Sequence, residues 1–402
     1  MNRRTTGRVP GASGRRSRVT IVNVYEDDNR GSAALTLAAL QVARRLVADP
    51  EIVVVPVRAS GPNAYRHLRG ERDVTVAEPL VVAPTGRFGT LAAFAASVLM
   101  LVGIPTRLGG ARPATWRAIR DADIVLSRGG VIFAQRASGL GDHARLWLAV
   151  LPCVVARRFR RRRCFVGAQI GPVITRAGAS ILRLAMGGAT YVWVRGPRSH
   201  DAARALVGHR GRVVQGPDSV FLLDPPPAPA KREGLVLVVG GDQGLTGAAV
   251  PALAAWLEAE HAPCTVLHQL TGDHTDRRWI ERLREHTAIT MHAVLDEDYD
   301  VRAYIDVLAR AELVVSTRMH SVLLGLLGGT PAVAVLIDDT YRKLDVLEGL
   351  GVADLAADPL EVSTVIAHAR TLTPVEIERH VDRWRREADR LVVEMGLAVG
   401  PI

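Results

Sequence analysis

Short apolar runs alternate with helical segments along almost the whole chain, and this alternation limits the possible folds more than any other feature of the sequence. Val19–Tyr25 has the pattern of a buried strand, the turn Glu26–Ser32 follows it, and Ala33–Val47 has the period of an amphipathic helix. Strand, loop and helix then recur as far as the strand Pro331–Leu336. Such alternation is typical of a mostly parallel sheet covered by helices. The sequence therefore predicts an α/β fold whose ligand-binding loops leave the carboxyl ends of the strands.

A proline-dense stretch interrupts this pattern near the middle of the chain. Asp224–Gly234 holds four prolines between two strand signals, which is typical of a stiff interdomain linker. A chain of 402 residues is also longer than one hydrophobic core usually organises. We therefore expect two Rossmann-like domains that face each other across a cleft. The expected parts are a disordered basic tail at 1–18, an N-terminal α/β domain at 19–224, a linker at 225–233, a C-terminal α/β domain at 234–372 and a closing helix at 373–402.

The formal net charge of +10 raises the question of a nucleic-acid partner. The distribution of the charge argues against one. Six arginines lie within Met1–Arg18 and six more within Arg157–Arg163, and the rest of the chain is close to neutral. Two local patches are more typical of a disordered tail, a solvated helix end or contact with an anionic membrane than of a surface that reads DNA. We expect no nucleic-acid partner.

The segment Leu91–Ile104 is nearly all apolar. Its 14 residues are fewer than the roughly 20 needed to cross a bilayer, so we expect a buried helix or an interfacial helix that dips into one leaflet. The run Val19–Val24 is too short for the apolar part of a signal peptide. The three cysteines lack metal-ligand spacing and fit a reducing compartment. We expect a cytoplasmic protein, and peripheral contact with the inner face of the plasma membrane is a further hypothesis.

The strongest local signal is the run Leu313–Ser321, in which a buried strand leads through Ser316 and Thr317 directly into a helix. This spacing places Arg318 and His320 at the N-terminus of the helix. Free backbone N–H groups, the helix dipole and a guanidinium group favour an anion there. A histidine at such a position can exchange protons near neutral pH. The plainer interpretation is that Arg318 pairs with an acidic neighbour and that His320 has only a capping role.

Ser316–His320, Gly328–Ala334 and Tyr341–Lys343 together resemble the C-terminal motif block of the polysaccharide pyruvyl transferase family. Weaker matches follow the family's order along the rest of the chain. They are Asn29–Gly31, Ser127–Gly130, Gly167–Pro172, Val194–Ser199 and Gly216–Phe221.

Three positions depart from the family's pattern. Ser32 and Gly196 stand where an acidic residue is more usual, and Arg128 stands where a glycine is more usual. The similarity spans roughly Val19 to Val352. We expect these departures to affect which acceptor molecule the protein uses more than the type of reaction.

The resemblance implies the two-domain GT-B arrangement of glycosyltransferases. It also implies transfer of the enolpyruvyl group of phosphoenolpyruvate onto two hydroxyls of a sugar, in a polysaccharide or its lipid-linked precursor. The N-terminal domain would hold the acceptor and the C-terminal domain the donor. No metal and no cofactor is expected, because phosphoenolpyruvate is a co-substrate and no step requires a metal.

The resemblance further implies His320 as the acid–base catalyst. Asp218 is a second catalytic candidate that could activate an acceptor hydroxyl, although an aspartate after Gly-Pro is as often a turn residue. The implied substrate-binding residues lie in the same motifs: Arg195, Arg318, Lys343, Ser316, Met319, Asn29, Gly129, Gly130 and Gln169.

Two other functions stay open. A nucleotide-sugar glycosyltransferase of the same shape would bind a diphosphate at the helix N-terminus and a ribose through an acidic residue such as Asp338 or Asp339. A sugar-binding module without activity would explain the substituted loops at Ser32 and Gly196. The retained arginines and His320 argue against that second reading.

Overall fold

The computed structural model describes residues 16–402 except 27, 58–64, 69, 83–86, 136, 209–210, 241–248, 261–263, 271–274, 295–299 and 338–339. The expected tail lies outside these residues as far as residue 15, and so do Asp338 and Asp339. The first strand already begins at Arg18, whose backbone N–H donates to Asp123 Oδ2 at 2.8 Å.

The N-terminal half of the chain forms one eight-stranded sheet with the order β3-β2-β1-β4-β6-β7-β8, in which β5 also pairs with β6. The strands are β1 (Arg18–Val24), β2 (Glu51–Pro56), β3 (Val74–Val76), β4 (Ile124–Ser127), β5 (Gly130–Phe133), β6 (Arg162–Ile170), β7 (Tyr191–Val194) and β8 (Arg212–Gln215). The helices of this half are α1 (Arg30–Leu46), α2 (Arg87–Leu101), α3 (Pro113–Arg120), α4 (Leu140–Arg158), α5 (Arg176–Met186) and α6 (Pro197–Val207), with short 3-10 turns at Arg66–Leu68, Leu108–Gly110 and Ser219–Leu222 (η3).

The second half repeats the plan with six strands in the order β11-β10-β9-β12-β13-β14. The strands are β9 (Leu235–Val238), β10 (Cys264–Leu267), β11 (Met291–Val294), β12 (Leu313–Ser316), β13 (Ala332–Val335) and β14 (Ala356–Ala357). The helices are α7 (Ala249–Glu260), α8 (Thr275–Arg284), α9 (Val301–Arg310), α10 (Met319–Leu327), α11 (Thr340–Leu350) and α12 (Val362–Thr371), with a 3-10 turn at Ala353–Leu355. When β9 is counted as the first strand of this half, the order is 3-2-1-4-5-6, which is the strand order of a Rossmann sheet. The prediction of two Rossmann-like α/β domains is confirmed.

Strand sequence explains how each sheet is buried on two faces. All strand pairings among the described residues are parallel, and neighbouring residues of a strand point to opposite faces. Ile21 of β1 packs in a cluster with α1, whereas the next residue, Val22, packs in the cluster that contains α3 and α4. Both side chains are fully buried, and this is why the strands read as continuous apolar runs.

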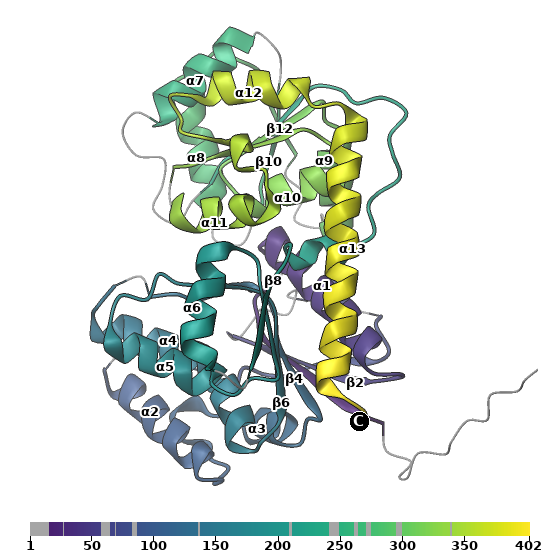
Figure 1. Ribbon diagram of the computed structural model, residues 1–402. Coiled ribbons are helices and arrows are strands. Elements are labelled where there is room, and N and C mark those ends of the chain that lie inside the picture. The colour runs from purple at the N-terminus through teal and green to yellow at the C-terminus, as the bar shows by residue number, and fades with distance from the viewer. Residues whose placement is uncertain are drawn as a thin grey trace, which may run out of the picture.

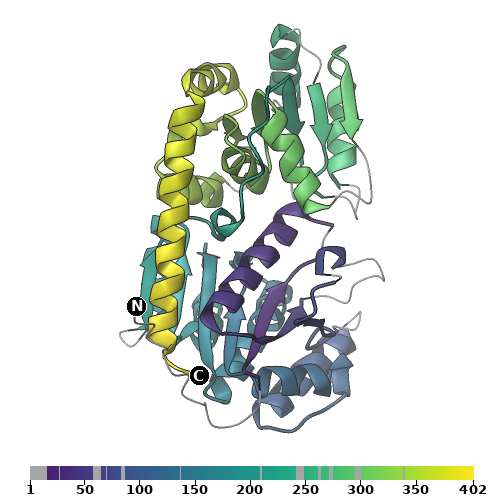
Figure 2. The same cartoon turned by 90° about the vertical axis from the view of Figure 1, so that its right-hand side faces the viewer.

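The last helix, α13 (Pro374–Val399), connects the two domains (Figures 1 and 2). It begins with a capping box formed by Thr373 and Glu376. Trp384 Nε1 donates to Leu350 O in the C-terminal domain at 3.1 Å, and Glu394 accepts from the Tyr191 hydroxyl of the N-terminal domain at 3.2 Å. The expected closing helix therefore also packs back on the N-terminal domain.

Two local expectations were wrong in detail. The first helix begins at Arg30 rather than Ala33, because Asn29 caps it by accepting from the Ser32 N–H at 3.2 Å. The basic run at 157–163 is not one patch, since α4 ends at Arg158 and β6 begins at Arg162. Arg163 is 5% exposed, and its guanidinium donates to backbone carbonyls at the end of α5.

The apolar segment Leu91–Ile104 forms most of α2, which is only partly buried. Its outer side exposes Phe94 and Val98, and Val102 and Ile104 continue the exposed apolar surface beyond the helix. Among the described residues, no helix is both long enough and apolar enough to cross a bilayer.

Candidate functional site

The carboxyl edges of the two sheets meet, and the loops that leave them touch across the domain boundary. The Arg30 N–H at the start of α1 donates to Gln269 O after β10 at 2.9 Å. Gln169 near the end of β6 donates to Arg342 O in α11 at 2.5 Å. The residues singled out by the sequence come from these loops, as the rule for parallel sheets requires.

Three of them form a cluster at this boundary: Arg195 after β7, Asp218 after β8 and His320 in the first turn of α10. Arg195 and Asp218 are fully buried and form an ion pair through Arg195 Nη1 and Asp218 Oδ2. Arg195 Nη1 also lies 3.3 Å from His320 Nε2. Since a guanidinium only donates, Nε2 is the accepting nitrogen, and the neutral ring carries its hydrogen on Nδ1.

The environment of the cluster sets its charge. Burial lowers the pKa of His320 to about 4, with Arg195 and Arg128 acting in the same direction and Asp218 against it. Burial alone would raise the pKa of Asp218, but Arg195 and His320 bring it below its ordinary value. At neutral pH the unliganded cluster therefore contains a carboxylate, a guanidinium and a neutral imidazole whose side chain is 15% exposed.

Asp218 makes the turn contact expected of an aspartate after Gly-Pro, and it also pairs with Arg195. Oδ1 accepts from the Val220 N–H at 3.0 Å and so begins the turn η3, while Oδ2 faces Arg195 and lies 4.0 Å from His320 Nε2. Gln169 Oε1 accepts from Arg195 Nη2 at 2.8 Å. The guanidinium of Arg195 is thus oriented from two sides.

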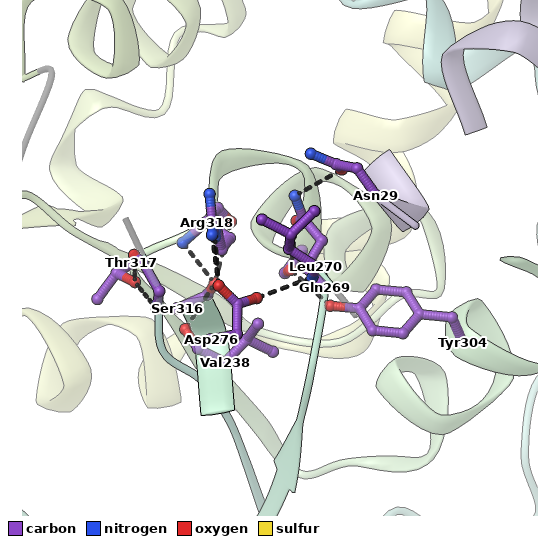
Figure 3. A network of polar contacts seen from close by, with 11 residues as sticks. Asn29, Val238, Gln269, Leu270, Asp276, Tyr304, Ser316, Thr317 and Arg318 are labelled. Carbon is purple, nitrogen blue, oxygen red and sulfur yellow. Dashed lines mark hydrogen bonds and ion pairs between the residues drawn. The ribbon is translucent and has the colours of Figure 1, made fainter. Parts of the chain in front are cut away.

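Arg318 also has an acidic partner, Asp276 in the first turn of α8 (Figure 3). Arg318 Nε donates to Asp276 Oδ1 at 3.2 Å, and Oδ2 of the same carboxylate accepts from the Leu270 N–H at 2.8 Å. The side chain of Arg318 remains 12% exposed. The sequence interpretation missed Asp276 because the loop before it has no recognisable pattern.

The turn between β12 and α10 is held by side chains. Ser316 Oγ accepts from the Arg318 N–H at 2.8 Å, and the Thr317 hydroxyl accepts from the Gly240 N–H at 2.8 Å (Figure 3). Arg318 is the N-cap residue and Met319 the first helical residue, as expected. Ser316 is 1% exposed, so its hydroxyl acts on the backbone of the turn.

A polar network joins α1 to the C-terminal domain. Asn29 Oδ1 accepts from Gln269 Nε2 at 3.1 Å, and Gln269 Oε1 accepts from the Ser321 hydroxyl at 2.8 Å. The Tyr304 hydroxyl lies 2.7 Å from Ser321 Oγ (Figure 3). Asn29 therefore positions the start of α1 beside α10.

The unusual Gly196 has a structural explanation in another part of the chain. A Cβ at this position would lie 2.3 Å from Cγ of Asp345 in α11, which is fully buried. Asp345 accepts from the Arg198 N–H at 2.7 Å and from the Ser199 hydroxyl at 2.6 Å. The C-terminal domain thus supplies the carboxylate that caps α6, and no signal in the local sequence indicated this.

The remaining candidates are Gly129, Gly130 and Lys343. Gly129 allows β4 to approach β6, since a Cβ there would lie 2.6 Å from Gly167 O, and Gly130 has a φ of +122°. Lys343 is 8% exposed in α11.

Gly31 leaves room for His320. A Cβ at position 31 would lie 2.6 Å from His320 Cβ. We expect Gly31→Ala to displace the imidazole and to lower turnover at least tenfold, with the melting temperature changed by only a few degrees. Gly139→Ala is the matched control, because a Cβ at Gly139 would meet no atom within 4 Å. Equal turnover of the two variants would contradict this placement of His320.

Solved structures with the same two-domain architecture show what the fold resembles. UDP-GlcNAc 2-epimerase from Neisseria meningitidis bound to UDP-GlcNAc has a TM-score of 0.52 and 12% identity, over 94% of this chain and 99% of that chain. A putative UDP-N-acetylglucosamine 2-epimerase from Listeria monocytogenes has a TM-score of 0.54 and 10% identity, over 93% and 91%. UGT2 from Phytolacca americana, complexed with UDP-2fluoro-glucose and pterostilbene, has a TM-score of 0.53 and 10% identity, over 96% and 100%. The fold is the GT-B arrangement.

Sequence comparison identifies the family. A comparison with curated proteins found no match. The family model for polysaccharide pyruvyl transferase matches residues 29–339, which include the cluster of Arg195, Asp218 and His320. The chain belongs to the polysaccharide pyruvyl transferase family.

Proposed function

We propose that this protein moves the enolpyruvyl group of phosphoenolpyruvate onto two hydroxyls of a sugar and so forms a pyruvate ketal. The acceptor would be a polysaccharide or its lipid-linked precursor. The observation that carries the proposal is the cluster at the domain boundary, where a neutral His320 in the first turn of α10 lies beside the Arg195–Asp218 pair.

In this reaction the C3 methylene of phosphoenolpyruvate takes up a proton and becomes a methyl group. The first sugar hydroxyl adds to C2 and gives up its proton. The second hydroxyl then forms a bond to C2 while the bond from C2 to the phosphate oxygen breaks, and its proton leaves with the phosphate. An acid and a base are therefore needed in turn, which one imidazole can supply.

His320 would begin as a proton acceptor, since its pKa of about 4 keeps it neutral. The phosphate and carboxylate of the donor bring negative charge to the site, and this charge raises the pKa of the imidazole. The protonated ring can then deliver a proton to C3, and the neutral ring can receive the proton of the acceptor hydroxyl. Asp218 would act through Arg195 as a positioning residue, because its carboxylate is fully buried.

The start of α10 and Arg318 are our candidates for the donor phosphate, on the C-terminal side of the boundary. Arg195 and Lys343 would complete the donor site, and the loops at Asn29 and Gly130 would face the acceptor. Contact with a membrane surface, through the exposed apolar side of α2, stays a prediction.

Calorimetric titration with phosphoenolpyruvate and with nucleotide sugars tests the proposal. We expect the wild type to bind phosphoenolpyruvate with proton uptake, measured in buffers of different ionisation enthalpy, and we expect His320→Gln to lack that uptake. If the donor raises the pKa of His320, this contribution to affinity would be present at low pH and would be lost as the pH rises through the pKa of the complex.

Arg318→Lys keeps the positive charge but loses the two-pronged grip of the guanidinium, and should weaken phosphoenolpyruvate binding. Arg277→Lys on the exposed side of α8 is the control. Binding of a nucleotide sugar without phosphoenolpyruvate would overturn the proposal in favour of glycosyl transfer. Binding of both would identify a nucleotide-linked acceptor, and binding of neither would favour a module without activity.

A further inference from the structure

Arg128, directly after β4, is a buried cation that the reaction described above does not use. Its side chain is 2% exposed, and burial lowers its pKa to about 10, so it is charged at neutral pH. Nε donates to Asn23 O at 3.2 Å and Nη1 donates to Ser32 O at 2.9 Å. Nη2 has no hydrogen bond to any residue that the structure describes, and no described carboxylate pairs with Arg128.

The other arginines of the site differ from Arg128 in this respect. Arg195 pairs with Asp218, and Arg318 pairs with Asp276, so each charge is compensated. A buried guanidinium without a counter-charge carries a desolvation penalty that an anion would offset.

A second buried arginine, Arg163, shows how such a charge is stabilised when its role is structural. Its two Nη atoms donate to Ala185 O and Gly187 O at the end of α5, where the helix dipole favours a cation. Arg128 donates instead to Ser32 O in the first turn of α1, the end of a helix that favours an anion. Arg128 therefore adds its charge at the end of a helix that already favours an anion.

The charge of Arg128 also reaches the reacting cluster. Its charge acts on His320 and lowers the pKa of the imidazole, and the first turn of α1 contacts His320 through Gly31. Gly130 lies beside the free nitrogen: a Cβ built at position 130 would be 3.9 Å from Nη2, so a side chain there would cover it.

We propose that Arg128 binds the carboxylate of the donor through Nη2, from the N-terminal side of the boundary. This inference rests on the proposed function and adds a residue at which this chain departs from its family. With the phosphate at the start of α10, the two anionic ends of phosphoenolpyruvate would be held by different domains, with C2 and C3 between them near His320.

The test compares phosphoenolpyruvate with vinyl phosphate, the same enol phosphate without its carboxylate. Calorimetric affinities of both are measured for the wild type, Arg128→Met and the matched control Arg163→Met, which also removes a buried arginine that has only carbonyl acceptors. We expect Arg128→Met to weaken phosphoenolpyruvate binding about 10- to 100-fold and to leave vinyl phosphate binding unchanged. Arg163→Met should change neither.

Three results would overturn the inference. If Arg128→Met binds phosphoenolpyruvate as tightly as the wild type does, Arg128 has no part in donor binding while the proposed function stands. If it weakens both ligands equally, its partner is not the carboxylate. If the wild type does not bind phosphoenolpyruvate at all, the proposed function fails and this inference fails with it.

Discussion

Replacing His320 by alanine is expected to lower turnover about 10²- to 10⁴-fold, the usual contribution of a positioned acid–base group. The imidazole is the only proton-exchanging side chain of the cluster that is neutral and partly exposed, since Asp218 is buried and paired. Turnover is measured as acceptor-dependent release of inorganic phosphate from phosphoenolpyruvate, with the sugar acceptor that calorimetry identifies.

His368→Ala is the control, because His368 is exposed and, among the residues that the structure describes, pairs only with the exposed Asp354. It should retain wild-type turnover. We also expect the affinity of His320→Ala for phosphoenolpyruvate to be within a few-fold of the wild-type affinity. This comparison is made at a pH high enough for the His320 imidazole to be neutral in the wild-type complex. Full turnover of His320→Ala would exclude His320 as the acid–base residue and would leave the family's reaction without a proton carrier in this cluster.

Replacing Arg195 by methionine is expected to reduce the free energy of unfolding by about 3–5 kcal/mol, because it leaves the carboxylate of Asp218 buried without its partner. The double variant Arg195→Met, Asp218→Asn removes both charges and should regain a large part of this loss. Denaturant unfolding of the two single variants and the double variant gives the coupling energy between the residues.

An exposed ion pair provides the comparison. Arg212 pairs with Glu394 on the surface, and its side chain is 52% exposed, so Arg212→Met should cost no more than about 1 kcal/mol. Strictly additive effects of the Arg195 and Asp218 substitutions would show that the two charges do not stabilise each other. The cluster would then not be the preorganised unit that the proposed function requires.

The pattern of the sequence predicted the sheets and the motif turn well. Strand β12 and the start of α10 were placed correctly because a buried parallel strand and a helix start each have a strong local signature in Leu313–Ser321. The start of α1 was placed three residues late, since the capping role of Asn29 was not recognised in the acidic turn before it.

The partners of the site residues could not be predicted in the same way. The sequence indicated that Arg318 would lie at a helix start, but the carboxylate that holds it comes from Asp276, 42 residues earlier. Likewise Arg128 was seen only as a departure from the family's glycine, and its burial without a carboxylate became visible once β4 and α1 were packed together.

By itself, the sequence determined which segments become strands and helices, and that the polar residues follow the carboxyl ends of strands. The reason is physical: burial on both faces of a parallel sheet needs continuous apolar runs, and this requirement is local. Tertiary structure alone decided which charges meet. Asp345 takes the space at Gly196 and caps α6 from 147 residues away, and such a pairing depends on how two domains approach, which no local pattern encodes.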